Sequence, residues 1–96
     1  MQFLVIGKDG DDTEALARRM AAREAHLALG AEMRKKGTLR YAAAILDDDG
    51  KMIGSAMFLE FEDRQKLDDW LEDEPYVKQG VWKKIDIVPC KAGPGF

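Results

Sequence analysis

The sequence predicts an α+β domain whose elements follow the order β-α-β-β-α-β. Three observations carry this prediction: a long alanine-rich segment without proline near the N-terminus, two apolar segments joined by a tight turn, and a second amphipathic segment ahead of a final apolar one. The chain has 96 residues, of which 46% are hydrophobic and 34% charged. Because this composition and length are typical of one small globular unit, we expect a single domain over residues 1–96, with residues 89–96 as a tail.

The charges argue against several classes of partner. Lysine and arginine number 15 against 18 aspartates and glutamates, for a formal net charge of −3, and both signs are interspersed. A balanced surface of this kind offers no basic patch for nucleic acid. Wholly apolar runs are only a few residues long, against about 20 for a membrane helix, and no charged leader precedes an apolar segment. We therefore expect a cytoplasmic protein with no nucleic-acid or membrane partner.

Few side chains are suited to binding a metal. Cys90 is the only cysteine and His26 the only histidine. An internal disulfide and a cysteine-based zinc cluster are thereby excluded, and a metal would need mainly carboxylate ligands. The sequence also lacks the motifs of nucleotide-binding loops and of α/β-hydrolases. We expect no metal and no cofactor.

The N-terminal third reads as a strand followed by a long helix. Residues 2–7 (QFLVIG) are rich in β-branched and aromatic side chains and end on glycine, which predicts a strand. Residues 13–36 contain no proline and many alanines, which predicts a helix. Asp11 and Glu14 have the spacing of a capping box, with Asp12 and Thr13 as competing N-caps. Gly37 follows three cations and is the expected helix end.

One stripe of this helix is expected to pack on the sheet. At about 100° per residue, four apolar side chains fall on one face. They are Leu16, Met20, Leu27 and Ala31. Arg23 projects near the middle of the stripe, Gly30 lies beside it, and His26 lies on its edge with Ala22 and Met33. A cation and an imidazole on an apolar face are unusual for a helix that only packs, so they mark a candidate site.

The middle of the chain predicts a β-hairpin. Residues 38–46 and 51–61 are extended in character, and Asp49-Gly50 between them favours a turn with positive φ. The second strand is apolar on both faces. Its odd positions carry Ile53, Met57, Leu59 and Phe61, and its even positions Met52, Ala56 and Phe58. One layer of helices covers one face only, so the other face requires a second sheet, most simply that of another subunit.

The last third supplies one more helix and one more strand. Asp63 is the expected cap of a helix over residues 64–72, which Pro75 ends. Its inward side chains are Leu67, Trp70 and Leu71. Residues 81–88 predict the final strand. The complete order is the ferredoxin-like β-α-β-β-α-β arrangement, with one antiparallel sheet and helices on one face.

Two of the candidate functional side chains lie in the helix. His26 is the natural proton carrier near neutral pH, and its alternative interpretation is a partly exposed helix histidine. From the residue alone, that plainer interpretation is favoured. Arg23 would bind a substrate carboxylate in a bidentate manner, or would pair with an acid of the chain or with its own helix end.

The other candidates lie on the second hairpin strand and after the second helix. Ser55 shares the Met57 and Leu59 face, where a buried hydroxyl needs a partner; alternatively it is a small satisfied hydroxyl beside Gly54. Glu74-Pro75-Tyr76 places a carboxylate and a phenol at a rigid turn, although helix termination alone explains the proline.

Several short motifs recur here in the order and spacing of a known family. They are Arg23-x-x-His26-Leu27, Gly37, Asp49-Gly50 followed by Gly54-Ser55, and Glu74-Pro75-Tyr76-Val77-x-x-Gly80-Val81. With these motifs the chain resembles the YCII-related (YciI-like) family from its first strand to Val88-Pro89. The resemblance implies a dimeric α+β barrel that pairs sheet to sheet. It also implies an active site with a histidine and a carboxylate as its ionisable pair.

By this resemblance His26 takes the place of the histidine, and Ser55 and Tyr76 fall where the family lines its pocket. The chain departs from the family at the acid, where Glu74 stands in place of the usual aspartate. Asp73 is the alternative partner for the histidine. A second departure is Tyr41-Ala42-Ala43-Ala44, where family members often have glycines. The added methyl groups are expected to reshape or shrink the pocket.

These residues lead to a functional hypothesis. Glu74 would orient His26, which would move a proton of a small anionic or ring-derived metabolite. Ser55 or Tyr76 would donate to the oxygen that gains charge, and Arg23 would hold the substrate anion. This is lyase or isomerase chemistry without a cofactor, in a homodimer. One alternative is a non-catalytic domain that binds a small metabolite in the same cleft. Another is a haem- or quinone-handling monooxygenase of the wider superfamily.

Overall fold

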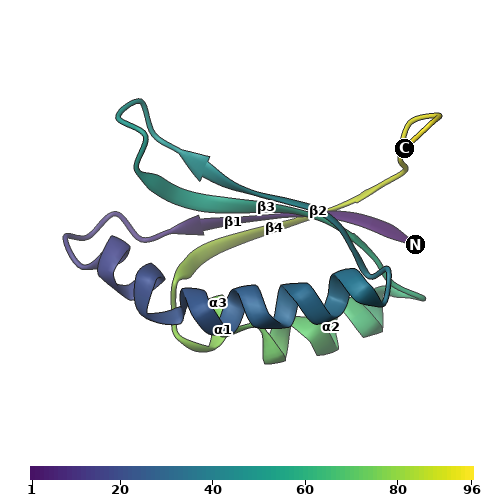
Figure 1. Cartoon of the computed structure of the whole chain (residues 1–96), viewed down its shortest axis with the longest axis horizontal. Coiled ribbons are helices and arrows are strands. Elements are labelled where there is room, and N and C mark those ends of the chain that lie inside the picture. Colours follow the sequence, from purple (N-terminus) through teal and green to yellow (C-terminus); the bar gives the residue numbers. More distant parts are fainter.

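The chain forms one four-stranded antiparallel sheet with helices on one of its faces (Figure 1). The computed structural model describes residues 1–96, and its strands lie in the order β2-β3-β1-β4. In chain order the elements are β1 (Gln2–Asp9), α1 (Ala15–Lys35), β2 (Leu39–Leu46), β3 (Met52–Glu60), α2 (Arg64–Asp73), α3 (Pro75–Lys78) and β4 (Trp82–Cys90). The predicted α+β class and ferredoxin-like order are confirmed. The one-turn helix α3 was not predicted.

The core lies between the sheet and the helices. β1 is a central strand, and its register places Phe3 opposite Leu59 and Val5 opposite Met57 of β3. Because side chains alternate along a strand, these four residues all point to the helix side. They pack there with further buried side chains: Ala22 and Met33 of α1, Leu39 of β2, Leu67 and Trp70 of α2, Tyr76 of α3, and Val81 and Trp82 at the start of β4. The predicted inward positions Leu67 and Trp70 of α2 are confirmed.

Two glycines and one aspartate mark the limits of the helices and the hairpin turn as the sequence predicts. Gly37 has a φ of 79° where α1 ends, and Gly50 has a φ of 83° in the hairpin turn. The Asp63 side chain accepts a hydrogen bond from the Lys66 amide at 3.0 Å and caps α2. The backbone φ values are in the region that only glycine adopts freely, which explains both glycines.

The capping box predicted for α1 is wrong. Glu14 occupies the N-cap position and makes no side-chain cap hydrogen bond, and Ala15 is the first helical residue. Instead, Asp12 accepts a weak hydrogen bond from the Glu14 amide at 3.3 Å and binds the guanidinium of Arg18 at 2.7 Å. Because the Asp12 carboxylate pairs with Arg18, the helix starts differently from the capping box that the sequence suggests.

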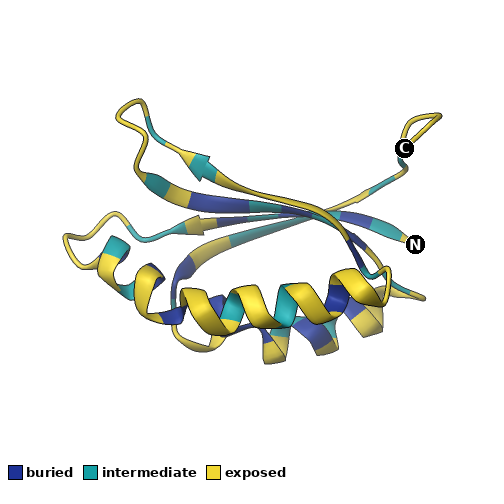
Figure 2. Cartoon of the chain, viewed as in Figure 1, coloured by how far each residue is buried: buried dark blue, intermediate teal, exposed yellow.

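The predicted packing stripe of α1 is also wrong. Met20 is 49% exposed and Leu27 is 50% exposed, whereas the buried residues of α1 are Ala15, Arg19, Ala22 and Met33. At about 100° per residue the buried face lies roughly 120° around the helix from the expected one. Figure 2 shows the result, a helix exposed over most of its surface. The face that packs contains an arginine, which a search for apolar periodicity passes over.

A β-bulge in β3 corrects the predicted strand faces. Ile45 of β2 pairs with Gly54 and Leu46 pairs with Met52, so that Ile53 is an extra residue without a partner. Ile53 is therefore 40% exposed, although the alternation predicts that it points into the core. Met52 takes the position on the helix side. Ser55, Met57 and Leu59 lie on the buried face as predicted.

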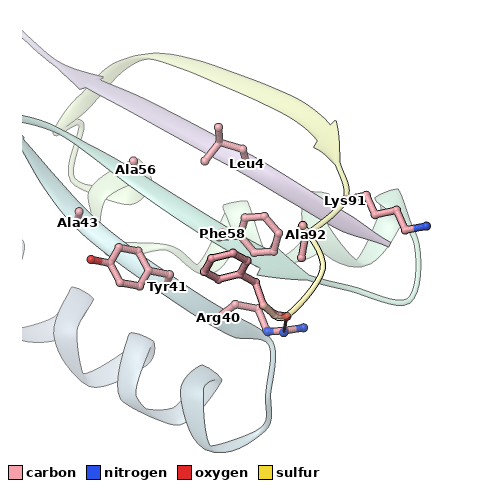
Figure 3. Close-up of a pocket in the computed structure, with 10 residues that line it drawn as sticks. Leu4, Arg40, Tyr41, Ala43, Ala56, Phe58, Lys91 and Ala92 are labelled. Carbon is pink, nitrogen blue, oxygen red and sulfur yellow. Dashed lines mark hydrogen bonds between the residues drawn. The ribbon is translucent and has the colours of Figure 1, made fainter.

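The second face of the sheet carries no helix and exposes apolar side chains (Figure 1). Tyr41 pairs with Phe58 and Ala43 with Ala56, and these side chains share this open face with Leu4 of β1. With the C-terminal segment they enclose a hollow of about 560 Å³ (Figure 3). The two-faced apolar pattern of residues 51–61 thus reflects one covered and one uncovered face. None of the helices is long and apolar enough to cross a membrane.

Candidate active site

A small cavity lies between α1 and the helix side of β2 and β3. Its volume is about 150 Å³. α1 contributes Arg19, Arg23, His26 and Leu27, β2 contributes residues 42–44, β3 contributes Met52, Ser55 and Met57, and α3 contributes Tyr76. β2 begins beside the end of α1 and diverges from the helix toward the hairpin (Figure 1). Four of the five residues that the sequence singles out line it.

The fifth residue, Glu74, lies behind His26. The Glu74 carboxylate is buried, and its Oε1 accepts a hydrogen bond from Nδ1 of the imidazole. The same oxygen accepts from the backbone N–H of Tyr76 at 3.2 Å, because Glu74 ends α2 and is the N-cap of α3. The turn that Pro75 imposes therefore holds the carboxylate in place. Asp73, the alternative partner, is exposed.

This contact determines the proton pattern of the ring. A carboxylate accepts hydrogen bonds and donates none, so Nδ1 carries a proton, and in the neutral ring Nε2 is an acceptor. The phenol ring of Tyr76 stacks on the imidazole, with 3.8 Å between the ring centroids and 9° between the planes. Glu74 thus sets the tautomer, and Tyr76 sets the plane of the ring.

The hydroxyl of Ser55 is enclosed by two donors. Arg19 Nη2 donates to Ser55 Oγ at 2.8 Å, and the indole Nε1 of Trp82 donates to it at 3.3 Å. Arg19 in turn forms a buried ion pair with Asp9, in which Nη1 is 3.0 and 3.1 Å from the two carboxylate oxygens. The guanidinium carbon lies 4.8 Å from the centre of the Tyr76 ring. This cluster joins β1, α1, β3, α3 and β4 around the cavity.

Sequence reasoning missed Arg19, Asp9 and Trp82. A usable signal for Arg19 is its spacing, since it lies seven residues before His26 and so shares its helix face. A signal for Trp82 is Gly7, where an added Cβ would lie 2.3 Å from Cδ2 of the indole. The glycine lets the indole lie across β1 and reach Ser55. Each signal becomes informative only when the partner residue is known.

Arg23 is exposed beside the cavity, and none of the ion pairs of the chain includes it. It is therefore available to a ligand. Ala42 and Ala44, which pair with Met57 and Ser55 of β3, place their methyl groups along the opposite side. At about 150 Å³ the cavity is small beside the roughly 300–1,000 Å³ that is common for ligand pockets, and the alanines contribute to this.

The phenol of Tyr76 is a hydrogen-bond donor at neutral pH. Burial raises the pKa of this hydroxyl above its ordinary value of 10.0, and the positive charges of Arg19 and Arg23 offset only part of the increase. Burial dominates because the phenolate would lose more hydration than the two arginines restore. No group of three or more histidine, cysteine, aspartate or glutamate side chains is arranged to hold a metal ion.

Comparison with known proteins identifies the family. Residues 1–91 match the sequence profile of the YCII-related domain. The chain belongs to the YCII-related family. It is 31% identical to the protein YciI of Escherichia coli and 30% identical to an uncharacterized protein of Haemophilus influenzae, and each alignment covers 95% of this chain and 97% of the relative. The resemblance carried by the sequence motifs is thereby confirmed.

Solved structures support the YCII-related fold. The chain is similar to the 5-chloro-2-hydroxyhydroquinone dehydrochlorinase TftG of Burkholderia phenoliruptrix, solved in complex with 2,5-dihydroxybenzoquinone. The TM-score is 0.82 at 26% identity, with coverage of 97% of this chain and 96% of that one. Rv0793 of Mycobacterium tuberculosis and an antibiotic biosynthesis monooxygenase each give a TM-score of 0.56 at 16% identity, with coverage of 98% or more of both chains. These two neighbours show the α+β barrel fold alone.

Proposed function

We propose that this protein is an enzyme of lyase or isomerase type in which His26 and Glu74 carry out acid–base chemistry. The observation that supports the proposal is the hydrogen bond from His26 Nδ1 to the buried carboxylate of Glu74. It leaves Nε2 of a cavity-lining imidazole as the proton acceptor. A base of this kind, oriented by a second group, is the arrangement that general base catalysis requires.

The proposed reaction begins with transfer of a substrate proton to Nε2. If the proton comes from a carbon next to a carbonyl, the electron pair that it leaves moves toward the carbonyl oxygen. If it comes from a ring hydroxyl, the pair stays on that oxygen as an oxyanion, from which it can be delocalised into the ring. Glu74 stabilises the imidazolium that forms, and Ser55 or Tyr76 donates to the oxygen that gains charge. In a lyase reaction a leaving group then departs with its bonding electrons. In an isomerase reaction Nε2 returns the proton to another atom.

The substrate class that fits is a small anionic or ring-derived metabolite. Arg23 is unpaired beside the cavity and is available to an anionic group of the substrate. The similarity to a dehydrochlorinase that was solved with a dihydroxybenzoquinone supports the same class. The small cavity favours a compound of about one ring.

A second candidate function is that of a binding or accessory domain without catalysis. Two features favour it: a glutamate where, by the resemblance, the family usually has an aspartate, and the methyl groups of Ala42 and Ala44 along a cavity of about 150 Å³. In this case the same cleft would hold a metabolite unchanged. Turnover separates the two functions, because both predict binding.

The test of function is an activity screen with matched variants. We would assay chlorinated hydroxyhydroquinones, small lactones and carbonyl acids, following chloride release and product formation by NMR. His26→Ala should lower turnover by about 10²–10⁴-fold. Because this change also leaves the buried Glu74 carboxylate without its partner, turnover is compared after confirming that the variant is folded at the assay temperature. Glu74→Gln should have a smaller effect in the same direction, and Glu74→Asp should retain activity.

Asp73→Asn is the matched control, since Asp73 adjoins Glu74 and is exposed. It should leave turnover unaffected. Full activity in His26→Ala would contradict the proposal. Binding of a screened compound by the parent protein, without turnover of any, would favour the accessory function.

We also propose that the protein acts as a homodimer joined through the open face of the sheet, in the cytoplasm. The support is the exposed apolar surface of that face, where Tyr41 is 67% exposed and Phe58 lies beside it. An uncovered apolar sheet face is stabilised by packing against a second sheet. The single cysteine is consistent with a reducing compartment.

A further inference from the structure

We propose that Arg19 is a positioning residue that makes the Ser55 hydroxyl a dedicated donor for an acceptor oxygen of the ligand. The ligand class follows from this role: compounds with a carbonyl or oxyanion oxygen next to the atom that gives its proton to His26. The inference rests on the proposed function for the proton transfer, but its central claim concerns binding.

The first step is the hydrogen-bond inventory of Ser55. A hydroxyl oxygen has two lone pairs and one hydrogen. Arg19 Nη2 at 2.8 Å and Trp82 Nε1 at 3.3 Å occupy the two lone pairs. No hydrogen bond of the chain uses the hydroxyl hydrogen, although Ser55 is buried and lines the cavity. A buried donor without an acceptor is costly, so a partner in the cavity is expected to complete it.

The second step is the rigidity of Arg19. Nη1 of its guanidinium binds both oxygens of Asp9, and the two side chains are only 4% and 3% exposed. The planar guanidinium is therefore held in one orientation, with Nη2 directed at Ser55. A hydroxyl that accepts a hydrogen bond from a cation becomes a stronger donor through its own hydrogen. The charge of Arg19 thus reaches the ligand through Ser55.

The third step concerns the role that Ser55 does not fill. A nucleophilic serine must present a lone pair to the substrate and give its proton to a base. Both lone pairs of Ser55 accept from nitrogen donors, and no hydrogen bond joins Ser55 to His26. The arrangement therefore suits stabilisation of a developing oxyanion and not formation of an acyl-enzyme.

A competing role for Arg19 is direct contact with the ligand. Arg19 also lines the cavity, and its buried Nε–H has no hydrogen-bond partner. Direct contact and action through Ser55 predict different couplings between substitutions of the two residues. If Arg19 acts through Ser55, its substitution has no further effect once the hydroxyl is gone. If it contacts the ligand, the two effects add.

The experiment measures the affinity of 2,5-dihydroxybenzoquinone, whose visible absorbance reports binding directly. We expect Ser55→Ala to weaken binding about tenfold or more, since a hydrogen bond to a charged or carbonyl oxygen is lost. Arg19→Lys should weaken binding several-fold alone and cause no further loss in the Ser55→Ala background. Trp82→Phe, which removes the other donor to Ser55 from outside the cavity lining, provides a second route should Arg19→Lys not fold.

1,2,4,5-Tetrahydroxybenzene, the reduced form of this quinone kept without oxygen, is the matched probe, because it carries hydroxyl groups where the quinone carries carbonyl acceptors. Ser55→Ala should therefore reduce the preference for the quinone over its reduced form, which a general structural defect would leave unchanged. Unchanged quinone affinity in Ser55→Ala, additive losses in the double variant, or no quinone binding by the parent protein would each overturn the inference. If Arg19→Lys causes no further loss of quinone affinity in the Ser55→Ala background, yet no substrate is turned over, the proposed catalysis is contradicted and the role of Arg19 stands.

Discussion

The imidazole of His26 lies flat on the phenol ring of Tyr76, with 3.8 Å between centroids and 9° between planes. Tyr76 follows by two residues the Glu74 that binds Nδ1 of the same imidazole. One turn, bent by Pro75, thus supplies both the carboxylate that determines the tautomer and the aromatic surface that determines the ring plane. The geometry of the candidate base depends on three consecutive residues that are 48 or more positions away from it in the chain.

The tautomer of His26 is the first testable consequence. The neutral ring should carry its proton on Nδ1, because Glu74 Oε1 is the acceptor at that side. Two-bond ¹⁵N–¹H correlation spectra of the single histidine report the tautomer directly. Glu74→Leu removes the acceptor and should shift the population toward the Nε2–H form, whereas Asp73→Asn should leave the spectrum unchanged. A parent protein with Nε2–H as its main form would contradict the proposed role of Nε2.

Tyr76 predicts a loss of stability at high pH. Burial raises the pKa of its hydroxyl above 10.0, so the native state holds this proton to higher pH than the unfolded chain does. The stabilisation is therefore fully present below about pH 10 and is lost as the pH rises through the native-state pKa. Urea unfolding from about pH 8 to about pH 11 should show a steeper decline for the parent than for Tyr76→Phe. Equal slopes would show that Tyr76 does not contribute.

The buried and exposed ion pairs of α1 predict unequal costs of substitution. Arg19→Met would leave the Asp9 carboxylate buried without its cation, at an expected loss of about 3–5 kcal/mol in the free energy of unfolding. Arg18→Met, one position earlier, removes a surface pair with Asp12 and should cost far less, because water screens that pair. Chemical denaturation of both variants provides the comparison. Similar losses would mean that the Arg19 pair is hydrated in solution.

Two glycines predict opposite effects of the same substitution. Gly7→Ala would place a Cβ 2.3 Å from the Trp82 indole and should destabilise the fold by about 1–3 kcal/mol, with loss of the indole hydrogen bond to Ser55. Gly30→Ala, within α1, should stabilise the fold by about 0.5–1 kcal/mol, because alanine favours a helix and the added Cβ would meet only Leu39 Cδ2, at 3.5 Å. Thermal unfolding followed by tryptophan fluorescence tests both. A stable Gly7→Ala variant would show that the indole has room to move.

The open face of the sheet predicts the oligomeric state. Light scattering at micromolar concentration should give twice the monomer mass of 10.8 kDa for the parent protein. Tyr41→Glu and Phe58→Glu should shift it toward the monomer, because each places a charge in an apolar interface. Leu27→Glu is the control, as Leu27 is exposed on the other side of the molecule. A monomeric parent, or dissociation by the control substitution, would refute dimerisation through this face.

Local signals in the sequence determined where the elements begin and end. Gly37, Gly50 and Asp63 were each identified correctly, because a positive φ or a side-chain cap is a property of a few neighbouring residues. The sequence motifs also determined the family, and through it the candidate residues. The α1 capping box and the inward orientation of Ile53 were wrong, since a nearby cation and a β-bulge changed the outcome.

Only the tertiary structure decided which face of α1 is buried and which groups surround Ser55. Apolar periodicity selects Met20 and Leu27, because burying a lone arginine is costly. Arg19 is nonetheless buried, since Asp9 of β1 neutralises its charge and accepts from Nη1, while Ser55 of β3 accepts from Nη2. Burial of Arg19 is stabilised by its contacts with Asp9, 10 positions away, and with Ser55, 36 positions away in the chain. Such contacts exist only once the sheet has formed, so no single segment of the sequence contains them.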